Sequence, residues 1–124
     1  MKPTSATVVV IDDDESVRKA LRRLIRSVGL AVTTHASAEE FLAGGGPPPG
    51  CLILDVRLPG MSGLDLQRLL ADSGRDVAVV VITAHEDQAV RRTALGAGAV
   101  DFIAKPFGRD RLLGAVAKAM ARGD

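Results

Sequence analysis

The chain has 124 residues, of which 47% are hydrophobic and 25% are charged, and its net charge is +1. These values indicate one globular domain and exclude a disordered chain, and the small net charge argues against a nucleic-acid-binding surface. The apolar runs, such as 77–82, are too short to cross a membrane. The single cysteine, Cys51, allows no internal disulfide and predicts a cytoplasmic setting, and two widely separated histidines argue against a zinc site.

Strand patterns and helix patterns alternate along the chain. Continuous apolar or β-branched runs indicate buried strands, and apolar residues at every third or fourth position indicate amphipathic helices. Asp14 fits a helix N-cap, Gly29 a helix end, and Ser37 with Glu40 a capping box, whereas the glycine- and proline-rich stretch 44–50 predicts a loop. In chain order we predict strand 7–11, helix 16–28, strand 30–34, helix 37–42, strand 51–54, helix 64–71, strand 77–82, helix 86–95, strand 99–103 and helix 109–121.

This alternation predicts an α/β fold of the flavodoxin-like type, with a doubly wound, five-stranded parallel sheet. Strands joined by single helices pair in parallel, with helices on both faces of the sheet. The expected strand order is 2-1-3-4-5, which places a ligand site beyond the carboxyl ends of strands 1 and 3. We expect one domain over residues 1–124, ordered over about 6–121, and leave open whether it is the N-terminal part of a longer protein.

Polar side chains follow four of the predicted strands at the same edge of the sheet. They are Asp12 and Asp13 after the first strand, Asp55 after the third, Thr83 after the fourth and Lys105 after the fifth. Each alone has a structural explanation, such as a helix cap, a turn or a solvated charge. Their coincidence at one edge favours a functional site.

The three carboxylates at this edge predict a site for a divalent cation. Converging carboxylates repel one another, and Mg²⁺ prefers such oxygen ligands but needs only one or two of them directly, because it keeps several waters. With the cation bound, Asp55 remains usable as a nucleophile, since carboxylates form aspartyl phosphates. The Lys105 ammonium and the Thr83 hydroxyl would then neutralise phosphoryl oxygens.

Four motifs follow the predicted strands in a specific combination. They are Asp12-Asp13, the segment 55–63 with its D-x-x-x-P-x-x-S-G pattern, Thr83-Ala84, and Lys105-Pro106-Phe107. Over about residues 7–121 the chain resembles the receiver domains of bacterial two-component response regulators. The segment 97–107 and the sequence Thr83-Ala84-His85 are similar to the nitrogen-fixation regulator subfamily. The resemblance implies a signalling domain that takes a phosphoryl group from a sensor histidine kinase, with Mg²⁺ as cofactor.

The resemblance also assigns the metal-binding roles residue by residue. Asp55 matches the phosphoacceptor. Asp13 matches a direct Mg²⁺ ligand, and Asp55 with the backbone carbonyl of Arg57 would complete the protein ligands. Asp12 matches the acid that holds the metal through water.

The remaining matches concern the phosphoryl group and the switch. Thr83 and Lys105 match the two residues that contact the phosphoryl oxygens, and Phe102 matches the aromatic residue that changes rotamer on phosphorylation. The Lys105-Pro106 bond is expected to be cis. His85 is a candidate modulator of water attack on the phosphoryl group, and it is equally well explained as an exposed loop residue.

The resemblance implies routes by which the signal enters and leaves. Basic residues on helix 16–28 are either a solvated face or a docking surface for the kinase. Phosphorylation would change the surface of helix 86–95, strand 99–103 and helix 109–121 and control an output, expected to be transcription. Helix 86–95 and strand 99–103 could form a phosphorylation-dependent homodimer through Ala89, Val90 and Ala94, although helix burial explains some of these residues.

We expect no enzyme activity beyond self-catalysed phosphoryl transfer and autodephosphorylation, and no binding to nucleic acid or membrane by this domain. Three other functions fit these residues less well. A flavodoxin-like cofactor binder needs a phosphate loop where this chain has the acidic residues 12–15. A haloacid-dehalogenase-type phosphatase needs an acid where Arg57 stands. A pseudo-receiver would lack one of the acids, the threonine or the lysine, all of which are present.

Overall fold

The computed structural model describes residues 7–44 and 49–122, so positions 45–48 of the predicted loop lie outside the described residues. The elements are β1 (Thr7–Ile11), α1 (Glu15–Arg26), β2 (Ala31–His35), α2 (Ala38–Gly44), β3 (Cys51–Asp55), α3 (Gly63–Asp72), β4 (Val79–Thr83), α4 (Gln88–Gly96), β5 (Asp101–Ala104) and α5 (Arg109–Arg122). All ten predicted elements are present, with ends that differ by a few residues. Within the two described ranges, no helix has the length and apolarity needed to span a bilayer.

The five strands form one parallel sheet in the order β2-β1-β3-β4-β5, which confirms the predicted topology. In the register between β1 and β3, Ile11 lies opposite Leu54. Asp12 and Asp55 therefore follow neighbouring positions at the same edge of the sheet. Between β4 and β5, Thr83 lies opposite Ala104, so Thr83 and Lys105 also meet at this edge.

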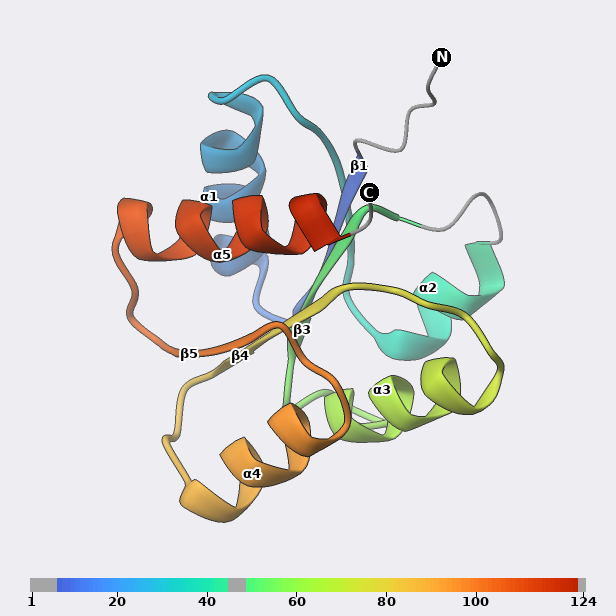
Figure 1. Cartoon of the computed structure of the whole chain (residues 1–124). Helices are drawn as coiled ribbons and strands as arrows, with labels where there is room; N and C mark the ends of the chain where they lie inside the picture. The colour runs from blue at the N-terminus through green and yellow to red at the C-terminus, as the bar shows by residue number, and fades with distance from the viewer. Residues whose placement is uncertain (1–6, 45–48, 123–124) are drawn as a thin grey trace.

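Helices cover both faces of the sheet (Figure 1). Helices α1 and α5 lie on one face, and α2, α3 and α4 lie on the other. Because both faces are covered, every residue of β3 and of β4 is buried, and the two strands read as continuous apolar runs that end in a polar residue. The polar end residues, Asp55 and Thr83, thereby end two strands that are buried along their whole length.

Helix N-termini depend on side-chain caps. The Asp14 carboxylate accepts a hydrogen bond from the Ser16 N–H at 2.9 Å, as predicted for the start of α1. Helix α4 begins at Gln88, two residues later than predicted. Asp87 is its N-cap, because the Asp87 carboxylate accepts hydrogen bonds from the backbone N–H groups of the first turn, including that of Ala89 at 2.8 Å.

Helix α2 carries a variant of the predicted capping box. The Ser37 hydroxyl accepts a hydrogen bond from the Glu40 N–H at 3.0 Å, as in the standard motif. The Glu40 carboxylate, however, accepts from the N–H of Ala36 at 2.9 Å rather than from that of Ser37. The box therefore fixes the residue just after β2, where the chain turns into the helix.

Candidate functional site

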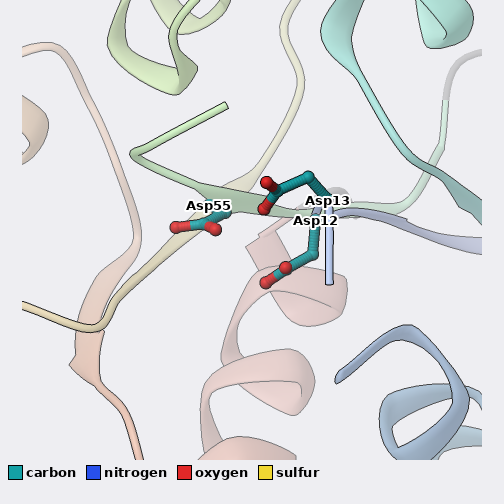
Figure 2. Close-up of side chains that lie close together, drawn as sticks. All are labelled: Asp12, Asp13 and Asp55. Carbon is teal, nitrogen blue, oxygen red and sulfur yellow. The ribbon is translucent and has the colours of Figure 1, made fainter. Parts of the chain in front are cut away.

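Three carboxylates converge at the carboxyl edge of the sheet. Asp12 and Asp13 follow β1 and Asp55 ends β3, and one oxygen from each lies within 4.8 Å of the others. Figure 2 shows the three side chains projecting into the same space. Asp12 is fully buried and Asp55 is 5% exposed, whereas Asp13 is exposed. The sequence prediction of an acidic cluster at this edge is confirmed.

Lys105 brings a positive charge into this cluster from the end of β5, which is the second strand along the sheet from β3. Its Nζ atom lies 2.8 Å from Asp12 Oδ2 and 3.4 Å from Asp55 Oδ2. The ammonium thus bridges the two buried carboxylates, as expected if all polar strand ends meet. The Lys105–Pro106 peptide bond is cis, as the resemblance implied.

The acidic loop after β1 is held by contacts that the sequence did not reveal. Asp12 Oδ1 accepts a hydrogen bond from the Asp14 N–H at 2.9 Å, and the Asp12 carbonyl accepts one from the Arg18 guanidinium at 2.7 Å. Arg18 is one of the basic residues of α1. Its place in the first turn of that helix, just after the acidic loop, is the one sequence signal for this contact.

Asp55 is held by the turn that follows β3. Its Oδ1 accepts from the Arg57 N–H at 3.3 Å, and the Val56 carbonyl accepts from the Gly63 N–H at 2.9 Å. A β-carbon at Gly63 would overlap the carbonyl oxygen of Asp55. The serine-glycine pair of the motif therefore has two structural roles. Ser62 caps α3, and only glycine at the next position lets that helix begin against Asp55.

Burial and charge act together on the ionisation of this cluster. Burial, and then the charge of Asp12, raise the pKa of Asp55, although Lys105 and the Arg57 N–H oppose the shift. Burial alone would lower the pKa of Lys105, but the hydrogen bond and charge of Asp12, with those of Asp55, outweigh it and the pKa rises. The lysine therefore stays charged, while Asp55 lies in surroundings that favour further positive charge.

Thr83 is buried beside the cluster and is bonded to its own loop. Its hydroxyl donates to the His85 carbonyl at 3.0 Å and accepts from the His85 N–H at 3.1 Å, and its carbonyl accepts from the Lys105 N–H at 2.7 Å. The His85 residue is exposed. Thr83 therefore connects the loop after β4 to the residue that bridges the carboxylates.

Phe102 lies apart from the carboxylates. It is 3% exposed and belongs to the apolar cluster between the sheet and helices α2, α3 and α4. The resemblance implied a ring that changes rotamer, and the structure places the ring in its buried orientation.

Residues 8–117 match the family model of the response regulator receiver domain. The chain belongs to this family. It is 45% identical over 121 residues to the response regulator protein TmoT of Ectopseudomonas mendocina, covering 97% of this chain and 55% of TmoT. It is 46% identical over 121 residues to the transcriptional regulatory protein FixJ of Azorhizobium caulinodans, covering 97% of this chain and 57% of FixJ.

Solved structures agree with this assignment. The crystal structure of FixJ-N matches with a TM-score of 0.86 and 41% identity, covering 96% of each chain. The response regulator StyR matches with a TM-score of 0.89 and 41% identity, covering 97% of this chain and 61% of StyR. This receiver domain spans about half the length of the curated relatives it matches.

The donor set of this receiver suits a hard divalent cation. The three carboxylates and the Lys105 ammonium together leave two net negative charges in a mostly buried space. Carboxylate oxygens that converge in this way are typical ligands of Mg²⁺, and the exposed Asp13 gives a cation access from solvent. The role of the Arg57 carbonyl as a ligand stays a prediction.

Proposed function

We propose that this receiver accepts a phosphoryl group on Asp55, with Mg²⁺ held directly by Asp13, Asp55 and the backbone carbonyl of Arg57, and by Asp12 through water. The observation that carries the proposal is the position of the Lys105 ammonium between the Asp12 and Asp55 carboxylates, with Asp13 within reach of both. A buried nucleophile next to a fixed cation and a metal-ligating pair is the arrangement that phosphoryl transfer needs.

The proposed transfer uses the Asp55 carboxylate as the nucleophile. A bond forms between Asp55 Oδ and phosphorus while the phosphorus–nitrogen bond of a phosphohistidine breaks, and the leaving imidazole keeps the electron pair. Mg²⁺, when bound, would supply positive charge to the phosphoryl oxygens. Lys105 would turn from Asp55 toward one of these oxygens, and the Thr83 hydroxyl would exchange its contact with His85 for another.

The test is incubation with a small phosphodonor and Mg²⁺, followed by intact mass. The wild type should gain one phosphoryl group, and Asp55→Asn should gain none. Asp72→Asn is the matched control, because Asp72 is an exposed acid at the end of α3. A stable adduct on Asp55→Asn would overturn the assignment of the phosphoacceptor.

The proposed phosphodonor is a sensor histidine kinase, and the surface around Lys105 supports this partner. An apolar hollow of about 520 Å³ lies beside Lys105, between residues of α1 such as Val17 and Ala20 and the Pro106–Phe107 turn. On the same helix, Lys19 and Arg23 are exposed basic residues. Ala20→Glu should slow phosphorylation by the kinase and leave phosphorylation by a small phosphodonor unchanged.

The proposed output is control of transcription through a surface of α4, β5 and α5, in a cytoplasmic regulator. The homodimer that we expect there cannot use Ala94, because this residue is fully buried, and Val90 is half-buried against the core. For Ala94 the alternative explanation, burial of the helix against the sheet, therefore holds. A phosphorylation-dependent dimer would use exposed residues of α4 such as Ala89, and light scattering with and without phosphodonor tests it.

Autodephosphorylation is the last part of the proposal. His85 is exposed, and its backbone N–H and carbonyl are bonded to the Thr83 hydroxyl, which keeps this residue next to Thr83. We expect His85→Ala to change the lifetime of phospho-Asp55 without changing the amount first formed. An unchanged lifetime would leave His85 as an exposed loop residue.

A further inference from the structure

The guanidinium group of Arg91 covers the ring of Phe102. Arg91 lies on α4 and its Cζ atom is 5.8 Å from the centroid of the Phe102 ring. Phe102 is 3% exposed and Arg91 is exposed, so a solvent-accessible cation lies over a nearly buried ring. This distance lies within the range in which a cation is attracted to the face of an aromatic ring.

The backbone of Phe102 is fixed on both sides. Its N–H donates to Asp101 Oδ1 at 2.8 Å, and its carbonyl accepts from the Arg111 guanidinium at 3.4 Å. In the ladder between β4 and β5, Phe102 lies opposite Val81. Any rearrangement of Phe102 is therefore confined to its side chain, and the groups that cover the ring decide which rotamer it takes.

We propose that Arg91 is a positioning residue that holds the Phe102 ring in its buried orientation. Among the residues that the structure describes, no carboxylate forms an ion pair with Arg91, and its guanidinium lies over the ring. Arg91 thereby sets how easily the ring leaves the core. The consequence for signalling rests on the proposed function, because a ring held more tightly needs a larger input from the phosphoacceptor site.

The chain offers a matched control at the next position. Arg92 is also exposed on α4, and its substitution removes the same charge, but it does not cover the ring. The measurement is the three-bond coupling of the Phe102 β-protons, which reports the rotamer populations, in protein selectively labelled at phenylalanine. Arg91→Gln should shift the ratio of buried to exposed rotamer by about two- to five-fold, the range typical of an exposed cation–ring contact.

Two further variants make the test specific. Arg91→Lys should give a rotamer ratio between those of wild type and Arg91→Gln, because it keeps the cation. Arg92→Gln should leave the ratio at the wild-type value. Equal ratios in wild type, Arg91→Gln and Arg92→Gln would overturn the proposal, and so would an equal shift in both glutamine variants. The couplings are recorded without phosphodonor, so a failure here is separate from a failure of Asp55 to be phosphorylated, which intact mass reports.

Discussion

The α-carbon of Gly63 lies against the backbone carbonyl of Asp55, so closely that a β-carbon would overlap its oxygen. The first residue of α3 is thus in steric contact with the proposed phosphoacceptor. Because interiors are close-packed, this contact makes the position of Asp55 depend on the absence of one methyl group.

Gly63→Ala should destabilise the domain and displace Asp55. Overpacking against backbone costs about 1–3 kcal/mol, because the sheet edge has no flexible side chain that could give way. Gly114→Ala, in the interior of α5 where a β-carbon meets open space, is the control and should gain about 0.5–1 kcal/mol. Urea unfolding followed by circular dichroism measures both, since the chain has no Trp or Tyr. Equal stabilities of the two variants would contradict the steric argument.

Mg²⁺ should stabilise the fold by binding the acidic cluster. At a concentration ten times its dissociation constant, the gain is about 1.4 kcal/mol, or roughly 4–6 °C in the melting midpoint. Asp13→Asn should abolish the shift and raise the midpoint slightly without metal, because one repulsive charge is gone. Asp72→Asn should behave as wild type. A midpoint that does not respond to millimolar Mg²⁺ would argue against the site.

Thr83→Ala should still be phosphorylated on Asp55 but should not transmit the change. The hydroxyl holds the loop after β4 through both backbone groups of His85, and its removal takes away these two bonds while the backbone bond between Thr83 and Lys105 stays. We expect the amide shifts that a phosphoryl mimic causes on α4 and β5 to disappear in Thr83→Ala and to persist in Thr83→Ser. If Thr83→Ala shows the wild-type shifts, the coupling runs through another residue.

Asp101 should make stability depend on pH in acid. Its hydrogen bonds with Arg111, partly opposed by burial, lower its pKa from 3.8 to about 2. A group with a lowered pKa in the folded state contributes its stability above pH 3.8, and the contribution is lost as the pH falls toward 2. Allowing for the half-exposed Arg111, Asp101→Asn should cost about 1–2 kcal/mol at neutral pH.

The difference between wild type and Asp101→Asn should therefore shrink between pH 4 and pH 2, as followed by urea unfolding. Asp76→Asn is the control, because Asp76 also pairs with an arginine, Arg122 at 3.0 Å, but its side chain is 88% exposed. Such a pair contributes little. A difference for Asp101→Asn that stays constant over this range would show that its ionisation is not the cause.

The fold and the members of the acidic cluster were predictable because they follow from periodicity and from the geometry of parallel strands. Asp12, Asp55 and Lys105 had to meet once the strand order was set, since parallel strands end at a common edge. Element ends were less predictable. Val77 and Ala78 are buried like strand residues, and the Ala78 carbonyl accepts from the Leu52 N–H at 2.9 Å, but the paired register of β4 with β3 begins only at Val79.

Contacts between side chains of different elements could not be predicted. The bond from Arg18 to the Asp12 carbonyl and the cover of Arg91 over Phe102 depend on rotamers and helix rotation, for which periodicity gives no signal. The same holds for Gln67, a polar residue on the buried face of α3. It donates to the Ala94 carbonyl at 2.9 Å, while its own Oε1 is buried without a hydrogen-bond partner among the described residues.

Cys51 offers a direct way to time the exposure of the strand that carries Asp55. The thiol begins β3, is fully buried, and burial raises its pKa to about 12, so it does not react while the sheet is intact. It is the only cysteine of the chain, so every alkylated molecule has exposed this one strand. The rate of alkylation at high reagent concentration therefore measures how often β3 opens, and intact mass can count alkyl and phosphoryl groups on the same molecules.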